Sequence, residues 1–299
     1  MPLAGWDQLF QDADQRRPLL PVAVAGGADR TALEALRAAS DRGWVRPVVA
    51  GPAADVRRLA AEVGVDLDGF TLVDAEDAAD AAVAEVRAGR ARLLMKGRVA
   101  TPALMRAVLD ASTGLRTGRT ICQVVLMEIA PARRRFLLAD TGVCARPTLA
   151  QKEDILGSAA ALARRLGADP VRVAVMAATE SVTEALPDTF DAAELARLGQ
   201  EGRFPGCVVQ GPLSFDLAYA ADAGDKKGVG GDVIGAADVM LFPDLTAANL
   251  TVKAIMYTAD CRFGGVLCGA ACPVAFMSRA DSTPTRLRSL ALALKLTAP

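Results

Sequence analysis

The feature of the sequence that most constrains the fold is a repeated alternation of short apolar runs, small-residue turns and helical stretches. Residues 21–25, 45–50 and 92–95 are β-branched or apolar runs with the length of buried strands. Each run leads through a turn into a pattern with helical periodicity. Such alternation is typical of an α/β protein, so we expect sheets covered by helices.

Capping residues mark the helix starts in the first part of the chain. Thr31, with a glutamate three residues later, predicts a capping box for a helix over 32–39. Asp55 predicts the cap of the next helix. The threonine–proline pair at 101–102 predicts the start of the helix that carries Arg106.

The alternation of strands and helices is interrupted in the middle of the chain. Runs at 123–129 and 135–139, joined by a segment that contains a proline, predict a β-hairpin that forms either a sheet edge or an intersubunit arm. The α/β alternation then resumes. Further elements are expected as a helix at 151–166, a strand at 172–177, a helix at 191–198, strands at 207–210 and 239–242, a helix at 248–259, a strand at 274–277 and a helix at 284–295.

The chain has no histidine among its 299 residues. A histidine general base, a Ser/His/Asp or Cys/His couple, a two-His zinc site and a 2-His-1-carboxylate iron site are therefore excluded. Cysteines 261, 268 and 272 cluster in the sequence, but three thiolates without a fourth ligand make a poor zinc site, so no metal is expected. We interpret all six cysteines as reduced, small hydrophobic residues.

Net charge, composition and length further limit the classes of protein to which this chain can belong. The net charge is -1 and only 4% of the residues are aromatic, which argues against nucleic-acid binding. No apolar run approaches the roughly 20 residues of a membrane span, and the N-terminus has no signal-peptide core, so a cytoplasmic location is expected. The length suits two domains of ordinary size, and no flexible linker composition separates them.

The loop at 278–284 has the most distinctive polar content. In open α/β sheets, ligands bind where the carboxyl ends of strands lead into helix N-termini. Ser278 and Arg279, together with the positive end of the following helix dipole, suit a phosphate or an oxyanion. The alternative is that Asp281 or a neighbouring hydroxyl caps the helix while Arg279 makes a surface ion pair.

Three further loops carry candidate binding residues. Asp244, Asn249 and Lys253 converge on one end of a helix, although Asn249 also suits a simple helix cap. Gly211, at a strand end, lets a ligand approach the backbone, and an ordinary turn is the alternative. The basic loop at Lys96, with an arginine on the next helix, is also typical of a solvated surface.

The sequence matches neither of two common nucleotide-binding motifs. The glycine-rich run at 228–231 lacks the third glycine of a dinucleotide loop, because position 233 is valine. Nothing matches the GxxxxGK[ST] phosphate loop. Nicotinamide and P-loop nucleotide binding are therefore not expected.

Seven short stretches, in order along the chain, resemble the phosphate acetyl/butyryltransferase family, and its phosphate butyryltransferase branch in particular. Each is weakly informative by itself, whereas the ordered set is specific. The stretches are LMKG at 94–97, GLRTGR at 114–119, LLADTG at 137–142, QGPLSFD at 210–216, AAD at 236–238 running to PD at 243–244, AN at 248–249 with Lys253, and SRADS at 278–282.

The resemblance implies an α/β fold with two three-layer α/β domains of the isopropylmalate-dehydrogenase type, a central cleft and assembly as a homodimer. In that fold the C-terminal segment returns to the first domain. The implied domains are residues 1–143 with 265–299, and residues 144–264.

The implied reaction is reversible transfer of a short acyl group, butyryl or acetyl, between coenzyme A and inorganic phosphate. It proceeds in a direct ternary complex without a covalent enzyme intermediate. Acyl-CoA and phosphate are the partners, and no bound cofactor is implied. Both substrates are anionic and the acyl oxygen gains negative charge, which arginines and a helix N-terminus stabilise by a few kcal/mol per well-placed donor.

The resemblance also implies roles for individual residues. Ser278 matches the hydroxyl that stabilises the transition state, and Arg279 matches the phosphate-binding arginine. Arg106 matches a second basic position, and Arg119 is a further candidate. The other implied substrate-binding residues are Lys96, Asp244, Asn249, Lys253, Gly211 and Ser214.

The sequence departs from the family pattern at two points. In the acetyl branch, an aspartate seven residues after the motif serine acts as the base toward the thiol of coenzyme A, and this chain has Thr285 there. Asp281 is the nearest carboxylate and our candidate for the base, with proton release to solvent as the alternative. Ala247 and Ala248 precede Asn249 where the family usually has a glycine, which leaves the acyl-chain length open.

Two other functions stay open at this point. One is a non-catalytic member of the family that binds coenzyme A or an acyl phosphate, which the threonine at 285 motivates. The other is a dehydrogenase of the same fold. The missing dinucleotide loop and the missing family carboxylates argue against the second.

Overall fold

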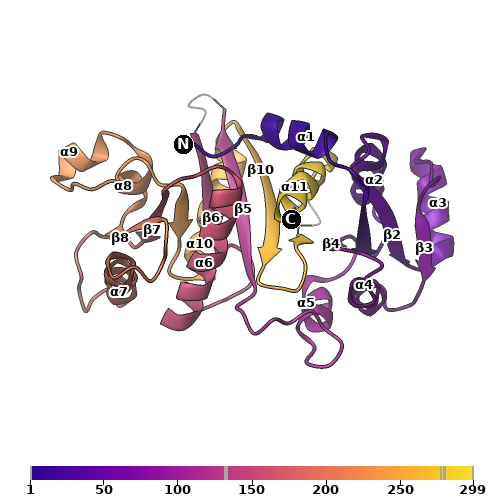
Figure 1. The fold of residues 1–299 in the computed structure, drawn as a ribbon, viewed down its shortest axis with the longest axis horizontal. Coiled ribbons are helices and arrows are strands. Elements are labelled where there is room, and N and C mark those ends of the chain that lie inside the picture. The colour runs from indigo at the N-terminus through magenta and orange to yellow at the C-terminus, as the bar shows by residue number, and fades with distance from the viewer. Residues whose placement is uncertain (1, 131–133, 277, 279–280, 298–299) are drawn as a thin grey trace. The chain divides into compact units, whose positions relative to one another are not determined.

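The computed structural model describes residues 2–130, 134–276, 278 and 281–297 (Figure 1). The chain divides into two compact units. We call Trp6–Arg119 with Phe263–Pro299 the N-terminal unit, and Met1–Gly5 with Thr120–Arg262 the middle unit. The main difference from the expected domains, which divide at 143/144 and 264/265, is that residues 120–143 group with the middle unit.

The N-terminal unit has a sheet in the order β3-β2-β1-β4-β11-β10. Its pairs are parallel except β10 with β11, which is antiparallel. The strands are β1 (Leu20–Ala25), β2 (Val45–Gly51), β3 (Thr71–Asp74), β4 (Leu93–Lys96), β10 (Cys261–Cys268) and β11 (Val274–Ala275). The helices are α1 (Trp6–Asp14), α2 (Arg30–Asp41), α3 (Ala53–Val63), α4 (Ala78–Arg87), α5 (Thr101–Leu109) and α11 (Thr283–Leu296).

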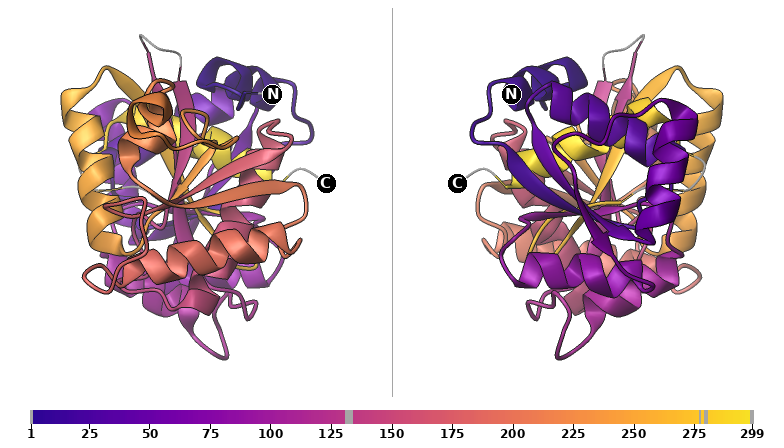
Figure 2. Two further views of the ribbon diagram at one scale, coloured as in Figure 1. Left: turned by 90° about the vertical axis from the view of Figure 1, so that its left-hand side faces the viewer. Right: turned by 90° about the vertical axis from the view of Figure 1, so that its right-hand side faces the viewer.

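Helices cover both faces of this sheet. α2, α11 and α1 lie on one face and α4 and α5 on the other (Figure 1), and α3 packs beside β2 and β3 (Figure 2). The central strand β1 is consequently apolar on both sides, with Val22 and Ala23, which point to opposite faces, fully buried. Burial on both faces is why such strands appear as continuous apolar runs rather than as alternating patterns.

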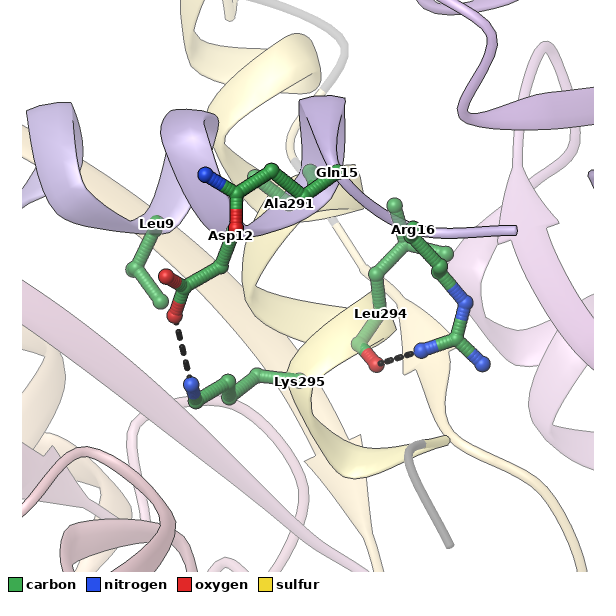
Figure 3. A pocket seen from close by; sticks show the side chains of 8 residues that line it. Leu9, Asp12, Gln15, Arg16, Ala291, Leu294 and Lys295 are labelled. Carbon is green, nitrogen blue, oxygen red and sulfur yellow. Dashed lines mark hydrogen bonds and ion pairs between the residues drawn. The ribbon is translucent and has the colours of Figure 1, made fainter.

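The contact between α1 and α11 is polar at the C-terminal end of α11. Asp12 pairs with Lys295 at 2.6 Å, and Arg16 donates to the carbonyl oxygens of Leu294 and Thr297 at 3.2 Å each. These side chains line a cavity of about 220 Å³ (Figure 3). The guanidinium satisfies carbonyl groups that a helix end leaves without intrahelical partners.

The middle unit has strands in the order β5-β6-β9-β7-β8, with β6, β9, β7 and β8 parallel. α6 and α7 pack against β7, and α10 packs against β6. The strands are β5 (Cys122–Ile129), β6 (Arg134–Ala139), β7 (Val171–Met176), β8 (Cys207–Leu213) and β9 (Val239–Leu241). The helices are α6 (Leu149–Arg165), α7 (Asp188–Gln200), α8 (Phe215–Tyr219), α9 (Ala223–Lys227) and α10 (Leu245–Thr258).

The predicted hairpin is confirmed, because β5 and β6 pair antiparallel from Val125 with Leu138 to Ile129 with Arg134. Its expected place at a sheet edge is wrong for β6. That strand also pairs in parallel with β9, which makes it an interior strand. This second pairing is the physical reason why residues 120–143 belong with the middle unit. The turn residues 131–133 lie outside the described residues.

At the three helices for which a cap or a first residue was predicted in the first part of the chain, the start differs from the one expected. α2 is capped by Asp29, which accepts the N–H of Ala32 at 3.2 Å, and Thr31 only donates its hydroxyl to the same carboxylate. α3 begins after Pro52, so Asp55 lies in its first turn. α5 begins at Thr101 itself, one residue earlier than expected. In each case the helix starts at the candidate cap or upstream of it.

Within the described residues, no helix has both the length and the apolar character needed to cross a membrane.

Candidate functional site

Three neighbouring parallel strands of the N-terminal unit end at the same edge of their sheet. Ala25 of β1 pairs with Lys96 of β4, and Met95 of β4 pairs with Ala275 of β11. The loops that follow these strands therefore leave the sheet side by side, at the end where open α/β sheets bind ligands. One of these loops directly follows Lys96 and another contains Ser278.

Two glycines allow the loops after β1 and β4 to contact each other closely. Gly97 donates its N–H to the carbonyl of Ala25 at 2.9 Å, and Arg98 donates to the carbonyl of Gly26 at 2.7 Å. A Cβ atom on Gly97 would lie 2.2 Å from the carbonyl oxygen of Gly26. Gly26 has a φ of +83°, a backbone conformation that favours glycine. The glycine of the LMKG stretch is therefore required by close backbone packing.

The loop before α11 exposes Ser278 and fixes its backbone. The carboxylate of Asp281 accepts the N–H of Ser278 at 2.6 Å, and the carbonyl of Ser278 accepts the N–H of Asp281 at 3.3 Å. Asp281 is 8% exposed. The cap of α11 is Ser282, which accepts the N–H of Thr285 at 3.4 Å. Arg279 lies outside the described residues.

Thr285 is buried in the first turn of α11, at the position where the resemblance implies an aspartate. Its hydroxyl lies 3.0 Å from the hydroxyl of Ser282 and accepts a hydrogen bond from Arg288, also at 3.0 Å. A hydroxyl with these two neighbours stabilises the start of the helix. It supplies no carboxylate for proton transfer.

A buried arginine links the same loops and was not singled out from the sequence. Arg286 of α11 donates to the carboxylate of Asp29 at 2.8 Å and to the carbonyl of Lys96 at 3.0 Å. Asp29 in turn caps α2. The available signal was a charged residue four positions before Leu290, on the buried side of the last helix.

Beside these loops lies a cavity of about 800 Å³. It is lined by Gly26, Gly27 and Arg98 and by the first residues of α3, α4 and α5. α3 and α5 begin without a cap from the side chain at the N-cap position. The N–H of Ala53 in α3 nevertheless donates to the carboxylate of Asp74 at 2.8 Å, and Pro102 in the first turn of α5 has no N–H, so few N–H groups remain for an anion. Arg58 and Arg98 add positive charge, whereas the carboxylates of Asp55, Glu76 and Asp77, which also line the cavity, offset it.

The remaining basic candidates of this unit differ in exposure. The side chain of Lys96 is buried at the end of β4. Arg106 is exposed on α5, and Arg119 is exposed in the segment that follows it. The N–H of Arg119 donates to the hydroxyl of Thr117 at 3.4 Å. The structure thus gathers Lys96, Ser278 and Asp281 at one sheet edge and leaves the two arginines on the surface.

In the middle unit, a buried carboxylate organises the loop after β6. Asp140 accepts the backbone N–H groups of Gln123, Gly142, Val143 and Cys144 at 2.7 to 3.2 Å. Burial raises the pKa of Asp140 above its ordinary value, and these donors act in the opposite direction. Its position in the LLADTG stretch is therefore explained by loop structure.

Asp244, Asn249 and Lys253 lie on or next to α10, near this loop. Asp244 caps the helix by accepting the N–H of Ala247 at 2.8 Å. Asn249 donates its amide to the carbonyl of Thr141 at 3.1 Å, which ties α10 to the loop after β6. Lys253 is exposed one turn further along. The cap of α10 is therefore Asp244, and Asn249 does not serve as the cap.

Gly211 and Ser214 lie at the end of β8. A Cβ atom on Gly211 would meet the Cβ of Val175 at 2.7 Å and the carbonyl of Ala192 at 3.2 Å, so the space above this glycine is filled by β7 and α7. The absence of a side chain at Gly211 therefore allows close packing of β7 and α7, and it does not open space for a ligand. Ser214 belongs to a surface cluster, in which it donates to Asp216 at 2.6 Å and accepts from Lys227 at 3.0 Å.

No group of three or more metal-ligating Cys, Asp or Glu side chains occurs in the part of the chain that the structure describes.

Comparison with known proteins identifies the family. The sequence matches the family model described as phosphate acetyl/butaryl transferase over residues 75–294. The chain belongs to this family. Phosphate butyryltransferase from Clostridium acetobutylicum is 37% identical over 275 residues, which cover 91% of each chain. Phosphate acetyltransferase from Rhizobium meliloti is 36% identical over 291 residues, covering 96% of this chain and 92% of its own.

A solved structure supports the same assignment. The branched-chain phosphotransacylase from Enterococcus faecalis V583 superimposes with a TM-score of 0.82 at 26% identity, covering 93% of this chain and 98% of that one. The expected family and the expected α/β fold class are both confirmed. This member of the phosphate acetyl/butyryltransferase family is an enzyme, a phosphate acyltransferase.

Proposed function

We propose that this phosphate acyltransferase converts a short-chain acyl-CoA and inorganic phosphate reversibly into an acyl phosphate and coenzyme A. A phosphate oxygen bonds to the acyl carbonyl carbon, the carbon–sulfur bond breaks, and the sulfur leaves as a thiolate that then takes a proton. The exposed Ser278 at the positive end of α11, held by Asp281 and followed by Arg279, carries this proposal.

The roles of the residues follow from the charges that the reaction develops. The hydroxyl of Ser278 donates to the acyl oxygen as negative charge builds up on it. Arg279 binds the phosphate through its planar guanidinium, which matches a phosphate in geometry. Lys96, Arg106 and Arg119 are proposed to contact the anionic substrates.

The middle unit is proposed to supply further substrate contacts through Lys253 and Ser214, whereas Asp244, Asn249 and Gly211 support the site structurally. Lys253 has the strongest support, because an exposed ammonium one turn beyond Asn249 suits an anionic group. Asp244 and Asn249 support it by fixing the start of α10 and its contact with Thr141. Gly211 contributes through the packing of β8.

Asp281→Asn separates two roles of this carboxylate. The amide oxygen of asparagine still accepts the N–H of Ser278 but does not take a proton. If Asp281 is the base for the thiol of coenzyme A, turnover toward acyl-CoA falls about 100-fold at pH 7. The loss shrinks as the pH rises toward about 8.5, where a thiol ionises without a base. Steady-state rates with acyl phosphate and coenzyme A measure both effects.

A second variant, Asp281→Ala, tests the alternative that Asp281 only positions the loop. Wild-type turnover in Asp281→Asn, together with a large loss in Asp281→Ala, assigns Asp281 to loop positioning. The proton of the thiol then goes to solvent.

The proposed reaction needs no bound cofactor, because the thioester itself supplies the activated acyl group. A cytoplasmic location is proposed because coenzyme A thioesters are intracellular metabolites. We further propose assembly as a homodimer through α10. On this apolar helix, Leu250 is 65% exposed and Tyr257 is 79% exposed, seven residues apart on one face.

Leu250→Asp with Tyr257→Asp is expected to convert a dimer into a monomer. Two carboxylates in the centre of an apolar interface lose their hydration on association, which opposes it strongly. Light scattering coupled to size-exclusion chromatography measures the mass of wild type and variant. A dimeric mass in the double variant places the contact elsewhere. Asp substitutions at exposed Arg57 and Glu62 of α3 serve as the control.

The function is tested by phosphate-dependent release of free thiol from acetyl-, propionyl-, butyryl- and longer acyl-CoAs. Release that requires phosphate is the expected result, with the chain-length optimum read from the series. Binding of coenzyme A by calorimetry without turnover on any thioester contradicts the catalytic proposal and indicates a binding protein. Thiol release that does not depend on phosphate indicates a hydrolase instead.

A further inference from the structure

Arg286 occupies a place in the N-terminal unit that the proposed reaction does not explain. It is 1% exposed, although its guanidinium is always charged. Nη2 donates to Asp29 at 2.8 Å, and Nη1 donates to the carbonyl oxygen of Lys96 at 3.0 Å. The third nitrogen, Nε, is buried and has no hydrogen-bond partner.

Stability does not account for an arginine at this position. The desolvation of a buried ion pair costs about as much as the attraction returns, and well-packed apolar residues are often at least as stable. The N–H without a partner adds to the cost. A buried charge with these properties is better explained by the geometry that it imposes on its partners.

The contacts of Arg286 join three segments beside the proposed reaction site. Asp29 lies in the loop after β1 and caps α2. Lys96 ends β4 next to Gly97. The N–H of Arg286 donates to the carbonyl of Ser282 at 3.0 Å, which closes the first turn of α11 directly after the loop that contains Ser278.

Arginine is suited to this task by its shape. Its planar fork reaches two acceptors at a fixed separation, whereas a lysine ammonium on a flexible chain binds as a single point. A lysine at 286 therefore keeps the charge opposite Asp29 but does not hold the carbonyl of Lys96 in the same geometry.

We propose that Arg286 is a positioning residue for the acyl transfer. Together with Asp29 it locks the loops after β1 and β4 to the start of α11, so that Lys96 and Ser278 stay in the arrangement in which they meet the substrates. This proposal rests on the proposed function. Arg286 acts through these groups and contacts no substrate itself.

Two variants test the proposal in the full-length enzyme. Arg286→Lys keeps the charge and loses the fork. The double variant Asp29→Asn/Arg286→Met removes both charges, so it leaves no unpaired buried carboxylate and folds even where a single Arg286→Met does not. We expect kcat to fall about tenfold in the first and about 100-fold in the second, because small misplacements of reacting groups cost this much. The KM values and the melting temperature change little.

Arg135→Lys is the matched control. Arg135 also bridges two acceptors, the carboxylate of Glu128 at 3.0 Å and the carbonyl of Leu3 at 2.9 Å, but it lies in the middle unit on β6 and touches none of these loops. Its substitution is expected to lower the melting temperature without lowering the kcat of the folded enzyme.

The outcomes separate the two proposals. If the wild-type enzyme shows phosphate-dependent turnover and the Arg286 variants have an unchanged kcat, the positioning role is wrong and the proposed function stands. Equal losses of kcat in Arg286→Lys and Arg135→Lys, in proportion to melting temperature, also overturn it, since they indicate a general loss of folding. If the wild-type enzyme releases no thiol in a phosphate-dependent way, the proposed function is wrong, and the positioning role that rests on it is wrong too.

Discussion

Replacing Arg279 by alanine is expected to lower phosphate-dependent turnover about 1000-fold. The guanidinium is proposed to bind the phosphate and to offset the charge that develops during attack, and loss of one such donor costs roughly 10²–10³ in rate. Ser278, Asp281 and the cap of α11 at Ser282 make their contacts without this side chain, so the loop remains in place. The fold is therefore expected to survive.

The measurement is the rate of thiol release as a function of phosphate concentration, with the melting temperature as the check of folding. Arg279→Lys distinguishes charge from shape: a lysine restores part of the phosphate affinity but not the bidentate contact. Arg57→Ala, at an exposed arginine of α3, is the control for loss of one positive charge. Wild-type turnover in Arg279→Ala removes this residue from the site.

Gly97→Ala is the second substitution with a large expected effect. The new methyl group would lie 2.2 Å from the carbonyl oxygen of Gly26 and 3.0 Å from that of Ala25, and both neighbours are backbone atoms. The loops after β1 and β4 must therefore move apart. Overpacking of this kind lowers the free energy of unfolding by about 1–3 kcal/mol. Because Lys96 precedes this glycine directly, we expect kcat/KM to fall about 100-fold.

Denaturant unfolding and steady-state kinetics measure the two effects of Gly97→Ala separately. Gly230→Ala is the matched control, since a Cβ atom there meets nothing within 4 Å. A Gly97→Ala enzyme with normal stability and normal kcat/KM is inconsistent with the close packing of these two loops.

Much of the fold follows from the sequence because its strongest patterns are local. Buried strands such as β1 and β4 and the hairpin of β5 with β6 lie within one or two residues of their predicted limits. β3 was not predicted, because it is a four-residue strand at the sheet edge and is partly exposed, so it lacks an apolar run. β10 was not predicted either. It contains two adjacent glycines, which have low strand propensity.

The residues of the candidate site also differ in whether local sequence patterns predict them. The loop with Ser278 and Asp281 was predictable, because its polar residues are contiguous and a helix follows them. Asp29 and Arg286 were not, since their contact spans 257 positions and exists only when the loop after β1 meets α11. Gly211 shows the opposite error: a glycine at a strand end indicates close approach, but the sequence does not say whether a ligand or a neighbouring strand approaches.

The burial of the cysteines has a consequence for chemical labelling. Burial raises the pKa of Cys144 and of Cys272 to about 12, and it also raises the pKa of Cys207. At pH 8, about one in ten thousand of a thiol with a pKa near 12 is ionised, and the thiolate is the reactive form. These side chains should therefore react slowly with aromatic disulfides and alkylating agents. A colorimetric thiol reagent present during turnover then reports coenzyme A with little background from Cys144 and Cys272, and mild oxidants react slowly with these two thiols.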